Sequence, residues 1–244
     1  METFPNVFQC GAREIDGESS ILQIQGQWRS RYFKNDYPIV LELGCGRGEY
    51  TIGLAELYPE KNFIGIDIKG ARMWAGAKQA VATGKTNVAF LRTNIEMLTR
   101  FFAQDEVDEI WITFPDPQMK KATKRLTSSY FMARYQQVMK DGGLIHLKTD
   151  SPFLYGYTDE MVKANGYEVV YKTDDLYKSD FADTVRSLKT HYEKQWLERG
   201  MKIKYIQFRM TKKDQLTEPE VDIEYDDYRS YGRYRTQQLP TNTK

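Results

Sequence analysis

The chain alternates between short apolar runs and longer stretches with the spacing of amphipathic helices. Apolar runs rich in β-branched and aromatic residues predict strands, and most segments between them are long enough for a helix. The predicted strands are Ile39–Leu43, Asn62–Ile66, Asn87–Leu91, Val107–Phe114, Leu144–Lys148, Tyr167–Lys172 and Lys202–Met210. The predicted helical segments are Glu49–Leu57, Met73–Thr83, Ser128–Met139, Pro152–Ala164 and Phe181–Glu198.

Strands that alternate with helices indicate βαβ units. Such units build a mainly parallel sheet with helices on both faces. The pattern therefore predicts an α/β, Rossmann-like fold with a seven-stranded, mostly parallel sheet. We expect an N-terminal extension over 1–37, the folded domain over 38–212, and an acidic and polar C-terminal tail over 213–244.

Composition narrows the class of protein. A chain of 244 residues fits one compact domain with extensions, and 41% hydrophobic with 28% charged residues excludes disorder over most of its length. No apolar stretch is long enough to span a bilayer, and the N-terminus lacks the pattern of a signal peptide. Two cysteines without a CxxC pair and two histidines predict no disulfide framework and no metal site. We expect a cytoplasmic protein without membrane attachment.

A glycine-rich turn is the sharpest local pattern. Gly44, Gly46 and Gly48 follow a predicted strand and lead into a predicted helix. Glycine at such a turn adopts positive φ and lets a ligand approach the main chain, although a tight turn without a ligand is the simpler interpretation. A dinucleotide fingerprint needs a further glycine where this chain has Glu49, which disfavours a nicotinamide or flavin cofactor.

Polar side chains mark the ends of three successive strands. Glu42 directly precedes the glycines, and its carboxylate suits the sulfonium and ammonium of S-adenosylmethionine (SAM) but would repel a diphosphate. Asp67 ends the next strand, where an acid accepts both ribose hydroxyls. Asn94 follows the third strand and has an amide for the adenine edge, although alone it is equally a turn former. Together they predict a SAM site at the carboxyl ends of the strands.

The fourth strand ends in a stiff acidic loop. Asp116 lies between Pro115 and Pro117, and the two prolines limit the conformations of the loop and fix the direction of the carboxylate. A rigid turn without chemistry is the alternative. We favour a function because the loop follows the strand expected beside the cofactor.

A basic run comes next. Lys120, Lys121, Lys124 and Arg125 lie within six positions, and the segment 118–148 holds seven basic residues against one acid. A charge run is usually a solvated surface, but its place beside the acidic loop predicts a phosphate-binding surface. The total charge of +1 hides this surface, because 214–227 carries seven acids and no base. We interpret that tail as a solvated extension that competes with RNA for the basic surface.

Two further segments complete the pattern. Asp150 ends the fifth predicted strand and is expected to face the same crevice. The Thr190–Glu193 segment is explained either by an amphipathic helix with Tyr192 in the core or by a contact between Glu193 and a base edge.

The segments Phe114–Pro117, Lys120–Arg125, Lys148–Asp150 and Thr190–Glu193 together resemble the bacterial tRNA (guanine-N7-)-methyltransferase family in order and spacing. The resemblance covers roughly Pro38 to Met210. It implies a class I methyltransferase that uses SAM to methylate N7 of the variable-loop guanine 46 of tRNA. It implies no obligatory protein partner, and either a monomer or a homodimer.

The resemblance also assigns roles to individual residues. It makes Glu42, Asp67, Asn94 and Asp116 SAM-site residues, beside Gly44 and Gly46 of the glycine turn, and Asp116 the catalytic acid position. The implied substrate and RNA-binding residues are Lys120, Lys121, Lys124, Arg125, Asp150, Thr190, Tyr192 and Glu193. Gln118-Met119 stands where the family commonly has Trp-Pro, and the basic loop is shorter.

Two other functions stay open from the residues. One is a SAM-dependent amino-methyltransferase that acts on another RNA base. In such enzymes the acid or amide precedes two prolines, whereas here Asp116 lies between them. The other is a SAM-binding RNA module without catalysis. Three acids, Asp116, Asp150 and Glu193, in a crevice for polyanionic RNA disfavour pure binding.

Overall fold

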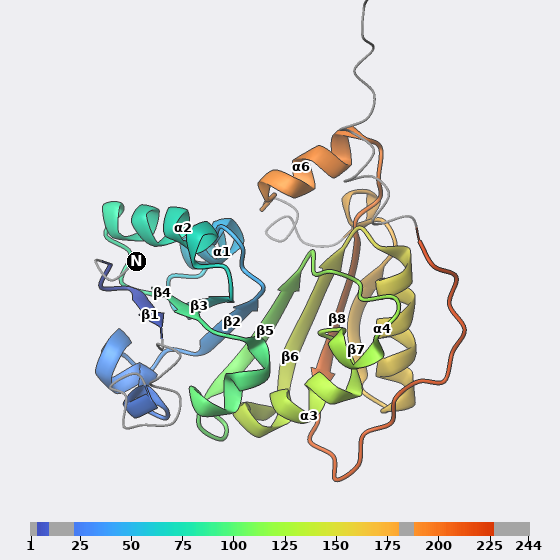
Figure 1. Cartoon of the computed structure of the whole chain (residues 1–244), viewed down its shortest axis with the longest axis horizontal. Coiled ribbons are helices and arrows are strands. Elements are labelled where there is room, and N and C mark those ends of the chain that lie inside the picture. The colour runs from blue at the N-terminus through green and yellow to red at the C-terminus, as the bar shows by residue number, and fades with distance from the viewer. Residues whose placement is uncertain (1–3, 10–21, 181–187, 227–244) are drawn as a thin grey trace, which may run out of the picture.

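One sheet organises the protein. The computed structural model describes residues 4–9, 22–180 and 188–226, and these form an eight-stranded sheet in the order β1-β4-β3-β2-β5-β6-β8-β7 (Figure 1). The strands are β1 Val7–Gln9, β2 Ile39–Leu43, β3 Asn62–Asp67, β4 Val88–Arg92, β5 Val107–Thr113, β6 Met139–Thr149, β7 Glu168–Thr173 and β8 Lys204–Met210. Neighbouring strands are parallel, except that β8 is antiparallel to β6 and β7. The predicted α/β, mostly parallel fold is confirmed.

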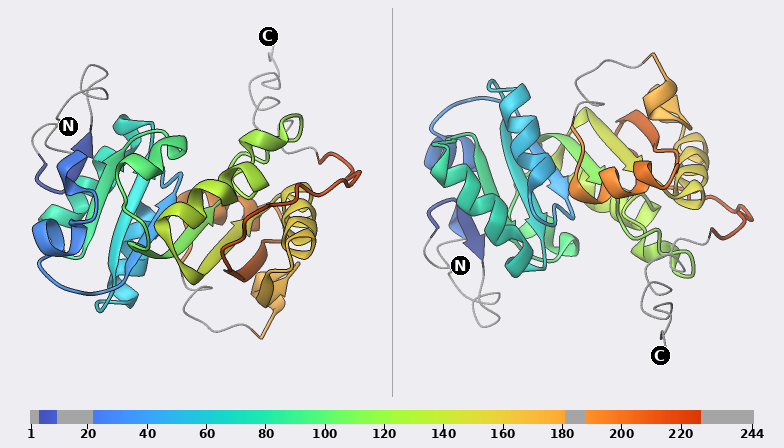
Figure 2. Two further views of the ribbon diagram at one scale, coloured as in Figure 1. Left: turned by 90° about the horizontal axis from the view of Figure 1, so that it is seen from below. Right: turned by 90° about the horizontal axis from the view of Figure 1, so that it is seen from above.

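Helices cover both faces of the sheet (Figure 2). The α-helices are α1 Glu49–Leu57, α2 Gly70–Ala82, α3 Ser129–Val138, α4 Pro152–Ala164 and α6 His191–Glu198. Shorter helical segments are η1 Leu22–Ile24, the π-helix η2 Trp28–Phe33, and η3 Ile95–Arg100, η4 Ala122–Lys124 and η5 Leu176–Lys178. None of the helices within the described ranges is long and apolar enough to cross a membrane.

Alternation along β2 shows why its sequence is almost wholly apolar. Leu41 and Leu43 pack in the core on the face covered by α3 and α4, whereas Val40 packs in a second core with α1 and α2. Both faces of a central parallel strand are buried, so both sets of side chains must be apolar. Glu42 is the exception, and it lies on the α1 side.

The sequence-based elements agree with the structure except in a few places. All seven predicted strands are present, and α1 and α4 have the predicted bounds. The sheet gains an eighth strand, β1, which pairs with β4 from within the expected N-terminal extension. Strand β6 begins at Met139 rather than Leu144. Of the predicted Phe181–Glu198 helical segment, α6 covers His191–Glu198, and 181–187 lies outside the described residues.

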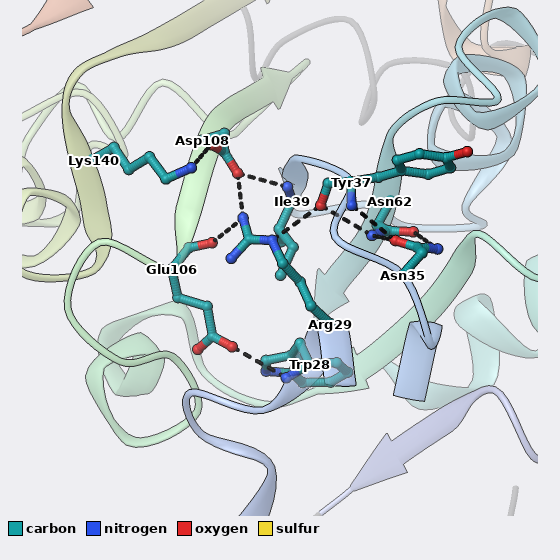
Figure 3. Close-up of polar contacts among 9 residues, drawn as sticks. All are labelled: Trp28, Arg29, Asn35, Tyr37, Ile39, Asn62, Glu106, Asp108 and Lys140. Atoms are coloured by element: carbon teal, nitrogen blue, oxygen red, sulfur yellow. Dashed lines mark hydrogen bonds and ion pairs between the residues drawn. The ribbon is translucent and has the colours of Figure 1, made fainter. Parts of the chain in front are cut away.

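Residues before β2 form hydrogen bonds at the edge of the sheet where the parallel strands β2 and β5 begin (Figure 3). The guanidinium of Arg29 donates to the Tyr37 carbonyl at 3.0 Å, to the Glu106 carbonyl at 3.0 Å and to the Asp108 carboxylate at 2.6 Å. Asp108 also accepts from the amide of Ile39 at 2.8 Å. The glycine turn lies at the other edge, where the strands end. The Arg29 contacts therefore stabilise the sheet at the edge away from the predicted site.

The acidic tail differs in part from the solvated extension that the sequence predicts. Residues 211–226, here called the C-terminal strap, run along the outside of α4 (Figures 1 and 2). Glu218 accepts from the Ser129 amide at 3.1 Å at the start of α3, and Asp226 accepts from the Phe153 amide at 3.2 Å at the start of α4. Carboxylates are favourable at helix N-termini, where amides are unpaired. Two acids of the strap are therefore docked, whereas Asp214, Glu220, Asp222 and Glu224 are exposed to solvent as expected. Residues 227–244 lie outside the described residues.

Candidate active site

The glycine turn opens onto a pocket at the carboxyl ends of the strands. Gly44 has φ 78° and Gly46 has φ 55°, and a Cβ atom on either would meet nothing within 4 Å. At Gly48 a Cβ would lie 2.5 Å from the Phe90 ring, so that glycine is needed for packing. The first two glycines thus leave space beside the main chain, as a bound ligand requires.

Glu42 is a buried carboxylate in the wall of this pocket. It is 3% exposed and accepts hydrogen bonds from the hydroxyls of Thr51 and Thr113, the latter at 2.7 Å. Burial, helped by the charge of the nearby Asp67, raises the pKa of Glu42 to about 7 even though the two hydroxyl donors lower it. A cation bound beside it would favour the charged form.

Asp67 fixes the glycine turn from the end of β3. One of its oxygens accepts from the Gly46 amide at 2.9 Å and the other from the Lys69 amide at 2.8 Å. Both pockets next to the turn include this side chain, one of about 120 Å³ with Glu42 and one of about 420 Å³ with Asp116. Asp67 is therefore held in place where the two spaces meet.

Asn94 and Asp116 both line the larger pocket. Asn94 caps η3 by accepting from the Glu96 amide at 3.3 Å. Asp116 is exposed and accepts from the Gln118 amide at 3.0 Å. Phe114 and Gln118 each have φ 49°, so two left-handed residues flank the Pro-Asp-Pro sequence and turn it into the crevice.

The four predicted RNA-binding bases fall into two pairs. Lys120 and Lys121 are exposed and line a third pocket of about 330 Å³. Lys124 forms a 2.6 Å ion pair with Glu96. Arg125 donates to the Met119 carbonyl at 2.7 Å, and its guanidinium lies over two aromatic rings of α4, those of Phe153 and Tyr157. Arg125 thereby supports the loop that carries the exposed lysines.

Glu193 and Lys148 form an ion pair that sequence reasoning missed. Their side chains are both 0% exposed, and Lys148 Nζ lies 2.7 Å from Glu193 Oε1. The Tyr177 hydroxyl also donates to Glu193, and Lys148 donates to the Leu188 carbonyl at 3.0 Å. Burial lowers the pKa of Lys148, and the Glu193 charge opposes this shift. The sequence held one signal of this pair, which is a lysine at the end of an apolar strand. A buried ammonium needs an acid as its partner.

Glu193 also fixes the start of α6. Thr190 and Glu193 form a capping box, and Thr190 lines the 120 Å³ pocket with Glu42. The ion pair with Lys148 therefore positions the first turn of α6 against the pocket wall. The Tyr192 side chain lies outside the described residues.

Asp150 lies beneath the crevice at the end of β6. Its side chain is 1% exposed, and within the described part of the chain neither carboxylate oxygen has a hydrogen-bond partner. Burial, together with the Asp226 charge, raises the pKa of Asp150 to about 6. The residue is at the predicted edge of the sheet, but the structure covers its carboxylate.

The structure thus brings Glu42, Gly44, Gly46, Asp67, Asn94 and Asp116 to two adjoining pockets. Arg72, from α2, and Phe114 line both pockets and were not predicted. No local pattern around Arg72 marks it, since its place depends on how α2 packs. Over the described ranges, no group of three or more side chains that could hold a metal ion is found.

Comparison with known proteins identifies the family. A family model described as "Putative methyltransferase" matches residues 36–206. Proteins named tRNA (guanine-N(7)-)-methyltransferase are 58% identical in Porphyromonas gingivalis (98% of this chain, 98% of that protein) and 54% identical in Bacteroides fragilis (99% and 95%). Among solved structures, the 16S rRNA methyltransferase KamB superposes with a TM-score of 0.57 at 16% identity, covering 77% of this chain and 92% of that one, which supports the fold alone. The chain therefore belongs to the tRNA (guanine-N(7)-)-methyltransferase family and has the class I methyltransferase fold.

Proposed function

We propose that this chain transfers the methyl group of SAM to N7 of guanine in tRNA, at position 46 of the variable loop. The observation that carries the proposal is the pocket that Asp67, Asn94 and Asp116 share at the carboxyl edge of the sheet. Two exposed lysines lie on the loop that follows Asp116. The family membership supports the choice of base and of nucleic acid, and we place the reaction in the cytoplasm.

The residues of the two adjoining pockets fit SAM. Gly44 and Gly46 leave open space at the main chain, and Glu42 is a buried acid that a positive charge would stabilise. Asp67 presents carboxylate oxygens where a ribose would lie, and Asn94 supplies an amide one strand further along. When bound, SAM supplies a methyl group on a positively charged sulfur.

Asp116 is the proposed catalytic residue. Guanine N7 has a free lone pair and needs no general base, so the protein's tasks are in-line positioning and a field that favours the cationic product. The Asp116 carboxylate can stabilise positive charge on the methylated purine, or accept a hydrogen bond from the N1–H edge. Full turnover by Asp116→Asn with intact SAM binding would exclude both roles.

The basic loop is the proposed RNA contact. Lys120 and Lys121 face solvent beside the crevice and would bind phosphates, with Lys124 and Arg125 next to them. Asp150, Thr190, Tyr192 and Glu193 remain proposed substrate residues. Because Asp150 and Glu193 are covered here, we expect them to act by shaping the crevice unless it opens when tRNA binds.

Methylation with labelled cofactor tests the proposal. The protein is incubated with bulk tRNA and SAM that carries a tritiated methyl group, and the labelled nucleoside is then identified by chromatography. We expect label in N7-methylguanosine. Label in N6-methyladenosine would instead support an amino-methyltransferase, and no label together with measurable SAM binding would support a binding module without catalysis.

A further inference from the structure

The C-terminal strap ends beside the basic loop. Thr217 and Asn165 exchange two hydrogen bonds of 2.8 Å, which hold the strap at the end of α4. Asp226 accepts from the Phe153 amide and the Ser151 hydroxyl at the start of the same helix. The strap thus follows α4 along its length and ends near the carboxyl edge of the sheet (Figure 1).

Tyr225 is held in place but left exposed. Its ring is 5.6 Å from that of Phe153, at an interplanar angle of 83°, and the residue is 59% exposed. Phe153 also contacts Arg125, whose guanidinium lies over the ring, 4.8 Å from its centroid. Arg125 also donates to the carbonyls of Gln118 and Met119. One chain of contacts therefore links the strap to the loop that follows Asp116.

These contacts enclose a pocket of about 330 Å³. Its lining residues are Gln118, Met119, Lys120, Lys121 and Tyr225. Gln118 also lines the pocket that contains Asp116, so the two spaces are neighbours. The strap is the part of the wall that comes from outside the methyltransferase core.

The lining has the chemistry of a nucleotide site. An exposed aromatic ring offers a stacking surface for a base of any sequence, and lysine ammonium groups bind phosphate oxygens. A carboxylate ligand would use the lysines but not the ring, and a purely apolar ligand would use the ring but not the lysines. The space beside Asp116 makes a nucleotide of the RNA substrate the occupant that uses both.

We propose that Tyr225 and the loop 118–121 bind a nucleotide of the tRNA that neighbours the methylated guanine, with its base on the Tyr225 ring and its phosphate near Lys120 and Lys121. This proposal rests on the proposed function and deepens it. It gives the strap a role opposite to competition with RNA. Glu218 and Asp226 accept hydrogen bonds at helix starts, and the exposed Asp222 and Glu224 do not line the pocket, whereas Tyr225 does.

Three substitutions at Tyr225 test the stacking contact in the full-length protein. The Kd for a tRNA transcript and the KM in methyl transfer are measured for Y225A, Y225L and Y225F. Removing a base–aromatic stack weakens binding by about tenfold, so we expect that loss for Y225A and a similar one for Y225L, which keeps apolar bulk without an aromatic face. Y225F should restore the affinity to within about threefold of the original protein.

Tyr37 supplies the matched control. It is 46% exposed and lies just before β2, at the opposite edge of the sheet. Y37A should leave the Kd for tRNA unchanged, and SAM affinity should be the same in all variants. Equal tRNA affinities for Y225A and Y37A, or a full recovery by Y225L, would overturn the nucleotide site. An original protein that transfers no methyl group to tRNA would overturn the proposed function instead.

Discussion

The proposed cofactor side and the proposed RNA side of the crevice are built in different ways. On the cofactor side, Glu42 and Asp67 lie at strand ends, and hydroxyl or amide donors fix their carboxylates. On the RNA side, Lys120 and Lys121 project from a loop into solvent, while Arg125 supports that loop. Sheet geometry alone determines the first set. The set on the RNA side depends on which basic residues of the loop form contacts within the protein. The sequence of the basic run does not show by itself which of these residues are free to face a ligand.

Breaking the buried ion pair beside the cofactor pocket should have the largest effect. Lys148→Met leaves the Glu193 carboxylate buried without its cation, which should lower the free energy of unfolding by about 3–5 kcal/mol. Urea denaturation measures this loss. The double variant K148M/E193Q removes both charges and should recover most of it. A loss under about 1 kcal/mol in the single variant would mean that the pair does not stabilise the wall.

The pH dependence of SAM binding tests the buried acid on the cofactor side. The pKa of Glu42 is about 7, raised by burial, and a cationic ligand prefers the carboxylate. Below this pKa binding must first remove a proton, so SAM affinity should fall by up to about tenfold per pH unit as the pH drops from 7. Above it the affinity should level off.

Calorimetric titration between pH 5.5 and 8.5 measures the profile, and Glu42→Gln is its control. Because the glutamine cannot ionise, the variant should bind SAM at least about tenfold more weakly at pH 8 and show a flat profile. If SAM affinity depended on pH in the Glu42→Gln variant as it does in the original protein, a group other than Glu42 would be responsible.

Salt dependence separates the two kinds of base on the RNA side. K120A/K121A should reduce the slope of log K against log salt concentration for tRNA binding by about 1.5, since each lost phosphate contact removes about 0.7–0.9. Arg125→Lys keeps the charge but loses the planar group that stacks on α4 and donates to two carbonyls. It should weaken binding several-fold with the slope unchanged. Identical slopes for the original protein and K120A/K121A would remove those lysines from the interface.

The smallest effect is expected on the strap. Glu218→Gln loses a charge that accepts from the amide and hydroxyl of Ser129, at 3.1 and 2.7 Å, and should lower stability by about 1 kcal/mol. Glu220→Gln neutralises an exposed acid on the same strap and should change stability by less than about half of that. Thermal unfolding compares them. If both substitutions raised the melting temperature equally, charge repulsion rather than docking would govern the strap.

The sequence predicted the parts of the molecule that depend on local pattern. The bounds of α1 and α4 follow from apolar periodicity and from signals such as Pro152 at the first helical position. Glu42, Asp67 and Asn94 could be placed because parallel strands bring their carboxyl ends to one edge. Each of these residues lines at least one of the two adjoining pockets.

The missed features depend on contacts between distant segments. β1 has only three residues, too few to show a strand period, and it exists because β4 offers a free edge. The Lys148–Glu193 pair joins positions 45 residues apart. In the sequence, Lys148 counts with the basic surface and Glu193 is interpreted as a contact for a base edge, so neither is paired with the other. Likewise the docking of Glu218 and Asp226 depends on the starts of α3 and α4, which the acidic run itself does not reveal.

Mapping the methylated position in paired transcripts tests the central claim most directly. One tRNA transcript carries guanine at position 46, and its partner carries adenine there and is otherwise identical. We expect the protein to form N7-methylguanosine only in the first transcript, at that position, and we expect Asp116→Ala to reduce the rate at saturating SAM by at least about a hundredfold. Equal N7-methylguanosine in both transcripts would contradict the proposed position, and its absence from both would contradict the proposed reaction.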